Sequence, residues 1–455
     1  MLRRYDYDLV VIGSGDAGGE AAILAAKDGL RVALIENGKW GGSRINSSDV
    51  PVGALLHISE ILHELNGASK LGINSTNVRY NYPTINNWKN VAMRRANANS
   101  KKVFEEAGVD CIEGTGRIIS KHEVSADDKT ITAAKILIAT GTAPLDTGIK
   151  IQEGVDYWLR DDVISMVRPP KSIFIVGAGS TGCEFAQFFS ALGTAVVIAD
   201  IAGRLLPRED EEVGQVLDEI FTKEHIKVLT QTRVVAIEDN APYKRVVFMR
   251  GGEEKSIRVD EVLLCTGSAP NIEVGLENAG IKHNANGITV DSFMRTSTKN
   301  IFAAGDVVGG HSSTEKALID ARTAVSHIEG GRSKVSADYR GLIRVTNTYP
   351  EIAEVGVTED DCIKSDRKYN KIVLPLDIAQ KANISNFYGG FIKIIASKGG
   401  RILGGTIMAP GAAVIAQELA FAVRYDMNVY EIALAPHVAN DWGEIVRVAC
   451  EQLCK

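Results

Sequence analysis

Short apolar runs alternate with helical patterns along this 455-residue chain. One apolar run covers 9–12 and breaks into glycines, an alanine-rich helical pattern follows, and a second run covers 32–35. Continuous apolar runs bounded by turn residues are typical of strands that are buried on both faces. Their alternation with helices predicts an α/β fold built on parallel sheets.

The segment that joins these two runs carries candidate chemistry. Gly13, Gly15 and Gly18 follow the first predicted strand, and Glu36 ends the second. Within a strand–turn–helix–strand unit this pattern is typical of a site for the ADP half of a dinucleotide. The glycines allow the tight turn, the approach of the backbone to the pyrophosphate and close helix packing, and the acid accepts hydrogen bonds from the ribose. The alternative is an ordinary buried turn between a strand and a helix.

The same arrangement returns later in the chain, with Gly177, Gly179 and Gly182 before Asp200. In both copies the acid lies 18 positions after the last glycine. Two copies predict two dinucleotides, one for each domain, and the alternative is a duplicated fold with one inactive site. The Asp200 carboxylate pairs with a free 2′-hydroxyl and repels a 2′-phosphate, which favours NAD over NADP. The nearby Arg204 weakens this preference, unless it is simply a surface residue.

Further patterns outline the domains. A run at 135–141 predicts a buried strand ending in a tight loop, and the run at 262–270 ends in the same way. A strand ending in Gly-Asp at 306 and a helix at 314–328 indicate that the chain returns to its first domain. We therefore expect dinucleotide-binding domains at 1–150 with 272–338 and at 151–271, followed by a mixed domain at 339–455. For this last domain we predict strands at 351–357, 390–396 and 403–408, and helices at 412–425 and 442–453.

Composition restricts the class of protein and its expected cellular location. Hydrophobic residues make up 45% and charged residues 24% of the chain, as in ordinary globular proteins. The net charge of −6 gives no basic footprint for nucleic acid, and no apolar run reaches the roughly 18 residues that span a bilayer. The six cysteines, with no hydrophobic signal region before the first strand, predict reduced thiols and a cytoplasmic location. No set of His and Cys has the spacing of a metal site.

The order of these features resembles the pyridine nucleotide-disulfide oxidoreductases, especially dihydrolipoamide dehydrogenase and its mercuric reductase and soluble transhydrogenase relatives. The motifs that carry the resemblance span essentially the whole chain: GSGDAG at 13–18, the Gly41-Gly42 turn, IATG at 138–141, the second fingerprint, TGSAPN at 266–271, AGD at 304–306, YPE at 349–351 and ILGG at 402–405. The resemblance implies FAD in the first domain, NAD in the second, and a C-terminal α+β domain that forms homodimers. It implies that FAD is lined by Gly13, Gly15, Gly18, Glu36, Gly42, Ser43, Gly116, Thr140, Gly141, Asp306 and Thr314. It implies that NAD is lined by Gly177, Gly179, Gly182, Glu184, Asp200, Val234 and Gly267.

One departure from the family concerns its redox-active disulfide. In the family, two cysteines separated by four residues and then a lysine follow the Gly-Gly turn, and the disulfide takes electrons from the flavin. Ungapped alignment places Arg44 and Asp49 at the cysteine positions and Gly53 at the lysine position. Neither Arg44 nor Asp49 can carry a disulfide electron pair, and Glu184 loses the lysine with which it pairs in the family. Arg44 and Asp49 either form a salt bridge in place of the cross-link or orient a polar or anionic acceptor.

A second departure lies near the C-terminus. The family places a His, and a Glu five residues later, at the active site of the partner subunit, where the pair acts as acid and base. Here Pro436 falls on the histidine position and Asp441 on the glutamate position, so that His437 comes one residue late. His437 and Asp441 are therefore candidate catalytic residues, and the alternative is a histidine with a surface or packing role.

These losses all affect the dithiol half of the family's chemistry. We therefore predict a flavoprotein that takes hydride from NADH and passes electrons from FAD directly to a small-molecule acceptor such as a quinone, a second nicotinamide or oxygen. One alternative is a dihydrolipoyl dehydrogenase in which Cys450 and Cys454 replace the missing pair, although two thiols on one helix facing the dimer interface fit these positions as well. Another alternative is a flavin-binding scaffold or redox sensor.

Overall fold

The computed structural model describes residues 5–74, 78–98, 100–328 and 335–454. The chain forms two compact units, each built from three segments. The first unit comprises Met1–Val52, Asn87–Leu145 and Gly267–Tyr339, and the second comprises Gly53–Asn86, Asp146–Thr266 and Arg340–Lys455. The predicted α/β class is confirmed, whereas the boundaries of the three predicted domains stay predictions. Within the described ranges, no helix is long and apolar enough to cross a membrane.

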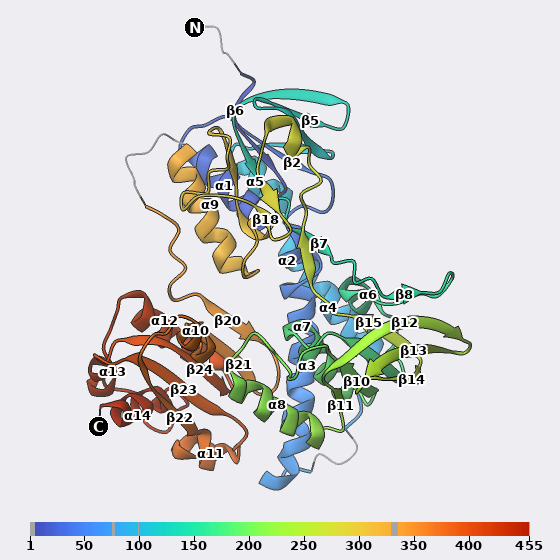
Figure 1. The fold of residues 1–455 in the computed structure, drawn as a ribbon, viewed down its shortest axis with the longest axis vertical. Helices are drawn as coiled ribbons and strands as arrows, with labels where there is room; N and C mark the ends of the chain where they lie inside the picture. Colours follow the sequence, from blue (N-terminus) through green and yellow to red (C-terminus); the bar gives the residue numbers. More distant parts are fainter. Residues whose placement is uncertain (1–4, 75–77, 99, 329–334, 455) are drawn as a thin grey trace. The chain divides into compact units, whose positions relative to one another are not determined.

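The first unit is organised around a mostly parallel sheet whose central strand is β1. The parallel strands are β1 (Tyr7–Ile12), β2 (Val32–Glu36), β3 (Asp110–Glu113), β6 (Lys129–Ile138) and β19 (Ile301–Ala303). Alternate residues of β1 contribute to two hydrophobic clusters, one on each face of the sheet. Helices α1 (Asp16–Lys27) and α9 (Thr314–Ile328) pack side by side over one face (Figure 1). Strands β4 (Gly116–Ser120) and β5 (Glu123–Ala126) extend the sheet beyond β6. The continuous apolar pattern therefore reflects burial on both faces.

Among the described residues, four further α-helices and four short strands belong wholly or partly to this unit. They are α2 (Gly42–Asn46), α3 (Asp49–Ala68), α4 (Tyr82–Asn97), α5 (Ser100–Glu106), β7 (Thr142–Pro144), β16 (Ser268–Pro270), β17 (His283–Asn284) and β18 (Gly287–Ile288). Helices α3 and α4 continue into the second unit. The loop endings that look alike in sequence, at 142–144 and 268–270, pair with each other as antiparallel strands.

The second unit contains a second parallel sheet, in the order β11-β10-β9-β15. Its strands are β9 (Ser172–Val176), β10 (Ala195–Ala199), β11 (Lys227–Leu229) and β15 (Glu261–Leu264), with α7 (Ser180–Ala191) after β9 and α8 (Glu211–Lys223) after β10. A separate sheet, which the sequence patterns did not predict, contains β8 (Lys150–Ile151), β12 (Thr232–Asn240), β13 (Tyr243–Arg250) and β14 (Glu253–Val259). Its outermost strand β14 is mostly exposed and charged, so it carries little hydrophobic signal.

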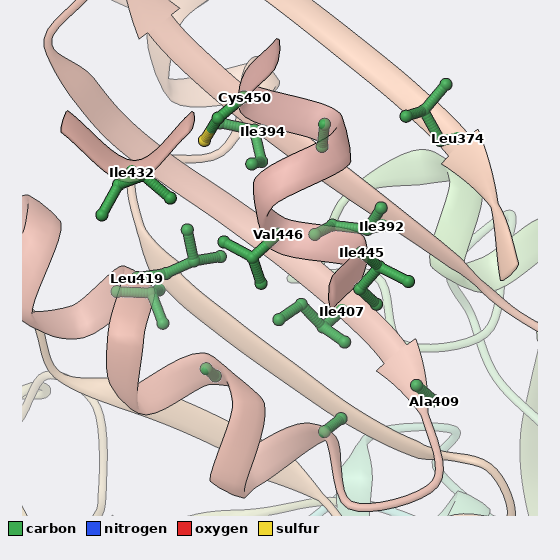
Figure 2. Close-up of a cluster of buried hydrophobic side chains, with 14 of the residues drawn as sticks. Leu374, Ile392, Ile394, Ile407, Ala409, Leu419, Ile432, Ile445, Val446 and Cys450 are labelled. Carbon is green, nitrogen blue, oxygen red and sulfur yellow. The ribbon is translucent and has the colours of Figure 1, made fainter. Parts of the chain in front are cut away.

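The C-terminal part of the second unit is a five-stranded antiparallel sheet covered by helices. The strand order is β20 (Ile343–Thr346), β21 (Glu351–Gly356), β24 (Ile402–Ala409), β23 (Phe391–Ser397) and β22 (Tyr369–Pro375). Helices α12 (Ala412–Arg424), α13 (Val429–Leu434) and α14 (Glu444–Leu453) enclose one apolar core with β23 and β24, which Figure 2 shows. Short helices α10 (Glu359–Lys364) and α11 (Gln380–Ser385) complete it. The strands and helices predicted for this region are confirmed to within two residues.

A buried lysine joins three separate segments of the second unit. Lys393, on β23, is 0% exposed. Its Nζ lies 3.2 Å from Asp210 Oδ1, 2.7 Å from Glu212 Oε2 and 2.8 Å from Glu359 Oε2. Burial alone lowers the pKa of Lys393, but hydrogen bonds to the two glutamates outweigh burial and raise it. The lysine is therefore charged, and it ties the start of α8 and of α10 to the sheet.

Candidate functional site

The first glycine triplet packs strand and helix too closely for any side chain. A Cβ at Gly18 would lie 1.9 Å from the carbonyl oxygen of Gly13, and one at Gly13 would lie 2.4 Å from that of Ala139. Gly13 also has a φ of 101°, in the left-handed region that favours glycine. The turn therefore brings the N-terminus of α1, capped by Gly15, against the ends of β1 and β6. This backbone cradle fits a dinucleotide pyrophosphate.

Glu36 points back from the end of β2 to the same turn. Its Oε2 accepts hydrogen bonds from the backbone N–H and the hydroxyl of Ser14, at 2.8 and 2.7 Å. Its Oε1 accepts one from the backbone N–H of Gly38 at 2.8 Å. The carboxylate therefore lies beside the glycine turn, as the fingerprint requires, and its bond to a ribose stays a prediction.

The Gly41-Gly42 turn lies directly against the first fingerprint. A Cβ at Gly42 would be 2.4 Å from the Cα of Gly15, and the N–H of Gly41 donates to the Ser14 hydroxyl at 3.0 Å. Ser43 follows in the first turn of α2. This close approach places residues 43–49, the segment predicted to stand in place of the family's disulfide, next to the N-terminus of α1.

Arg44 on α2 binds a carboxylate that sequence reasoning did not identify. Its Nε donates to Asp16 Oδ1 at 2.5 Å, and the hydroxyl of Thr314 donates to Asp16 Oδ2 at 2.8 Å. Asp49 Oδ2 lies 3.5 Å from the same hydroxyl. The interpretation of Arg44 and Asp49 as a salt bridge is therefore wrong, because α2 directs Arg44 toward the first turn of α1. The structure does bring Arg44, Asp49 and Thr314 together around Asp16.

The other residues expected around FAD have different local roles. The hydroxyl of Thr140 donates to the carbonyl of Asn271 at 2.7 Å, which closes the loop that contains Gly141. A Cβ at Gly116 would lie 2.7 Å from Cγ2 of Ile12, so glycine is required there for packing. Asp306 lies in a short 3-10 helix, and burial raises the pKa of its carboxyl, against the effect of Lys316. Their contacts with FAD stay predictions.

The Gly305-Asp306 turn is held by a buried ion pair on α9. Lys316 Nζ lies 2.8 Å from Asp320 Oδ2, which also accepts the backbone N–H of Gly305 at 3.0 Å. The hydroxyl of Tyr339 donates to Asp320 Oδ1 at 2.6 Å. Asp320 and Lys316 thus hold the turn that carries Asp306, because Lys316 Nζ also donates to the carbonyl of Gly305 at 3.3 Å.

The second fingerprint has the same close contact between strand and helix as the first. A Cβ at Gly182 would lie 1.9 Å from the carbonyl oxygen of Gly177, whereas one at Gly179 would meet nothing within 4 Å. Asp200 accepts hydrogen bonds from the backbone N–H groups of Ala178 at 2.6 Å and Ala202 at 2.7 Å. The second site therefore has the geometry of a second dinucleotide cradle.

Glu184 lies one turn into α7 and is 8% exposed. Its Oε1 accepts two hydrogen bonds from Asn347, from the backbone N–H at 2.8 Å and from Nδ2 at 3.0 Å. Val234 is buried in β12 beside an irregularity in the strand pairing. Gly267 has a φ of 96° and space around its Cα. Contact of these residues with NAD stays a prediction.

His437 has a carboxylate partner, but it is not Asp441. Its Nε2 lies 2.9 Å from Glu418 Oε1 on α12, and its Nδ1 lies 2.9 Å from the carbonyl of Ala435. Asp441 Oδ1 instead accepts the backbone N–H of Trp442 at 2.7 Å. The irregular backbone before α14 turns the His437 imidazole toward α12. Glu418 on α12, and not Asp441, is therefore the carboxylate that orients this histidine.

A partly buried histidine on α3 forms a further titratable pair in the second unit. His63 Nδ1 lies 3.5 Å from Glu224 Oε1, and the His63 ring stacks on Tyr349. Gln187 on α7 donates to both oxygens of Glu224 and to the carbonyl of Tyr349. Burial lowers the pKa of His63 to about 4 and raises that of Glu224 to about 7, although Gln187 opposes the latter shift.

Comparison with known proteins identifies the family that has this arrangement. The family model described as pyridine nucleotide-disulphide oxidoreductase matches residues 7–326, and the model of its dimerisation domain matches 343–448. This chain belongs to the pyridine nucleotide-disulphide oxidoreductases. It is 30% identical to the mitochondrial dihydrolipoyl dehydrogenase 2 of Arabidopsis thaliana, over 98% of this chain and 90% of that protein. It is 27% identical to a mercuric reductase of Bacillus cereus, over 96% of this chain and 70% of that protein.

A solved structure has the same fold. The crystal structure of LpdA from Mycobacterium tuberculosis matches with a TM-score of 0.88 and 27% identity, over 98% of this chain and 99% of that chain. Members of the family depend on FAD and NAD(P). The two glycine cradles of this pyridine nucleotide-disulphide oxidoreductase are of the kind that such cofactors need.

The cysteines of this family member are all free in the described structure. Cys450, on α14, is 0% exposed and belongs to the core cluster that also contains Ile394 and Ile432 (Figure 2). Burial raises the pKa of its thiol to about 12. Cys454 follows one turn later, and burial raises its pKa as well. Thiols that stay protonated are poor nucleophiles, so the structure gives these two the character of packing residues.

Sequence reasoning missed Asp16, Asn347, Glu418 and the His63–Glu224 pair. Each meets its partner through tertiary structure: Arg44 and Asp16 are 28 residues apart, and Asn347 and Glu184 are 163 apart. Only Asp16 carried a local signal, since it is an acidic residue in the first turn of the fingerprint helix. An acidic residue at that position is usually explained by its favourable interaction with the helix dipole alone.

Proposed function

We propose that this protein transfers hydride from NADH to FAD, and that the reduced flavin passes its electrons directly to a small-molecule acceptor. The main support for this proposal is the segment after the Gly-Gly turn, because residues 41–56 contain no cysteine. Arg44 stands at one cysteine position of the family and is ion-paired with Asp16. A carboxylate and a guanidinium cannot accept an electron pair as a disulfide does, so the electrons need an acceptor at the flavin itself.

The cysteines elsewhere in the chain support the same conclusion. Burial raises the pKa of Cys111 to about 11 and that of Cys265 to about 12. Burial also raises the pKa of Cys183 well above its ordinary value. Cys450 lies in a closed hydrophobic core, which argues against the alternative in which a C-terminal pair replaces the missing disulfide.

The surroundings of Asp200 favour NADH over NADPH as the hydride donor. Its carboxylate lies beside the second glycine turn, where it repels a 2′-phosphate. Arg204 is the nearby cation that weakens the preference for NAD in the sequence. Its Nη2 donates to the carbonyl of Glu209 at 3.0 Å and lies 3.4 Å from Asp360 Oδ2. With its guanidinium engaged there, Arg204 is poorly suited to bind a phosphate on the ribose.

The C-terminal domain supports a homodimer. Large apolar side chains lie on the outer surface of α12, α13 and the loop that follows, namely Phe421, Tyr425, Tyr430, Leu434 and Val438. Exposed apolar patches of this kind mark interaction surfaces. A second copy of the chain is the occupant that the matched dimerisation domain favours. His437, whose side chain is 8% exposed and oriented by Glu418, lies three residues after Leu434 and is a candidate acid for the partner's site.

Anaerobic titration of the FAD-loaded protein with NADH tests the proposal. We expect the flavin absorbance to bleach at one equivalent of NADH per FAD, with no long-wavelength thiolate–flavin band. A quinone, an oxidised nicotinamide analogue or oxygen should then restore the flavin absorbance, whereas oxidised lipoamide should not. The Cys450→Ser/Cys454→Ser variant should behave like the unmodified protein.

Two results would overturn the proposal. Uptake of two equivalents that disappears in the double cysteine variant would mean that a dithiol stores the second electron pair. Failure of NADH to bleach bound FAD would leave a flavin-binding scaffold. Among active proteins, the relative rates with the three acceptor classes would identify the acceptor.

A further inference from the structure

One face of the second fingerprint helix is bound along its length by a single segment of the C-terminal domain. Three residues of α7 at helical spacing contact the segment 346–349. The contacts join Ser180 Oγ to Thr346 Oγ1 at 2.9 Å, Glu184 Oε1 to Asn347 N and Nδ2 at 2.8 and 3.0 Å, and Gln187 Oε1 to Tyr349 N at 2.7 Å. This segment therefore sets the position of the helix that begins at the second glycine triplet.

The central contact involves a charged group. Glu184 is 8% exposed, and a carboxylate at that depth needs hydrogen bonds to stay ionised. Asn347 donates two of them, both to Oε1, and this fixes the plane of the carboxylate and the direction in which Oε2 points. The lysine that pairs with this glutamate in the resembling family is replaced by Gly53 here. Asn347 thus supplies hydrogen bonds to this carboxylate in a chain that has glycine at the lysine position.

We propose that Asn347 is a positioning residue for the reaction with NADH: it holds the Glu184 carboxylate in place of the missing lysine. The inference rests on the proposed function, because Glu184 matters only if NADH binds at α7. Glu184 lies one turn beyond the helix N-terminus at which the pyrophosphate is expected, on the path toward the nicotinamide. A carboxylate is purely a hydrogen-bond acceptor, so its fixed orientation suits the N–H groups of the nicotinamide carboxamide.

The main test is Asn347→Ala, studied by rapid mixing of the oxidised holoenzyme with NADH. The variant keeps the backbone N–H bond to Glu184 and loses the side-chain bond. A hydrogen bond to a charged group corresponds to about a tenfold effect or more, so we expect the NADH dissociation constant or the limiting rate of flavin reduction to worsen by at least about tenfold. Reoxidation of reduced flavin by the acceptor should not change, because that step does not involve Glu184.

Thr346→Val is the matched control, since it removes a contact of the same segment with α7 but leaves Glu184 untouched. A second variant, Asn347→Ala/Gly53→Lys, restores a lysine at the position that holds it in relatives. A Cβ at Gly53 meets nothing within 4 Å, so a longer side chain has room to start. We expect this double variant to recover most of the NADH affinity that Asn347→Ala loses.

The outcomes separate this inference from the proposed function. If NADH fails to reduce the flavin of the unmodified protein, the proposed function fails. If the unmodified protein is reduced normally and Asn347→Ala matches Thr346→Val in every step, Asn347 has only a structural role. A folded double variant that stays as impaired as Asn347→Ala would overturn the claim that the amide replaces the lysine.

Discussion

The substitution Gly182→Ala tests the second dinucleotide cradle most directly. The added methyl group would lie 1.9 Å from the carbonyl oxygen of Gly177 and 3.0 Å from its carbon. The first distance is more than about 1 Å below an ordinary non-bonded contact, and both atoms belong to the backbone at the end of β9. The side chain has no alternative rotamer, so α7 must move away from the strand.

The expected magnitude follows from two opposing effects. Overpacking of a rigid site typically costs up to about 3 kcal/mol. The better helix propensity of alanine offsets about 1 kcal/mol of this. A net loss of about 2 kcal/mol corresponds to a fall in Tm of roughly 4–8 °C for a domain of this size. We also expect NADH to bind much more weakly, because the displaced helix no longer presents its N-terminus to the pyrophosphate.

Gly179→Ala provides the matched control. A Cβ there meets no atom within 4 Å, and the φ of −76° suits alanine, so Tm should not change. The methyl group would nevertheless occupy the surface that the pyrophosphate approaches, so NADH affinity should fall. Both variants should keep their FAD. Thermal unfolding and NADH titration check these expectations, and Gly182→Ala with unchanged Tm and NADH affinity would refute the packing argument.

Two further predictions concern the second unit. As pH rises from 5 to 8, the Glu224→Gln variant should become progressively more stable than the unmodified protein. Burial raises the folded-state pKa of Glu224 from 4.5 to about 7, so the stability that Glu224 contributes is lost as pH rises through that range. Thermal unfolding of both proteins at several pH values checks this, and a constant difference in Tm would contradict it. Leu434→Glu should shift the protein from dimer to monomer in light scattering, because Leu434 is 84% exposed on the apolar surface of the dimerisation domain. Val167→Glu is the control, because Val167 is 78% exposed and lies outside the matched dimerisation region. A dimeric Leu434→Glu variant would argue against this surface.

The parts of the fold that could be predicted are those whose signal is local. The central parallel strands are continuous apolar runs because both faces of the sheet are covered. The first and last glycine of each triplet mark contacts that no side chain could occupy. The sheet at 232–259 was missed for the opposite reason. Its strands are half exposed, and β14 consists largely of charged residues, so hydrophobic periodicity says little there.

The candidate site could be predicted only as far as its motifs reach. Glu36 and Asp200 follow from spacing, and the structure places each carboxylate at its glycine turn. The partners of Arg44 and His437 could not be predicted. Each is chosen by tertiary structure, where α2 directs one side chain toward α1 and an irregular loop directs the other toward α12. A motif specifies which residue is present, and the packing of neighbouring helices decides what it touches.

The buried Lys393 has a consequence for how ligand binding is transmitted. Two of its carboxylate partners, Asp210 and Glu212, lie at the start of α8 beside the second parallel sheet, and the third, Glu359, lies at the start of α10. Separating these segments would leave an unpaired charge in the protein interior. The nucleotide-binding sheet and the C-terminal sheet are thereby coupled as one cooperative folding unit. If a dinucleotide binds at α7, we expect thermodynamic linkage to extend its stabilising effect to the strands of the C-terminal sheet, so that this sheet is protected from unfolding as well.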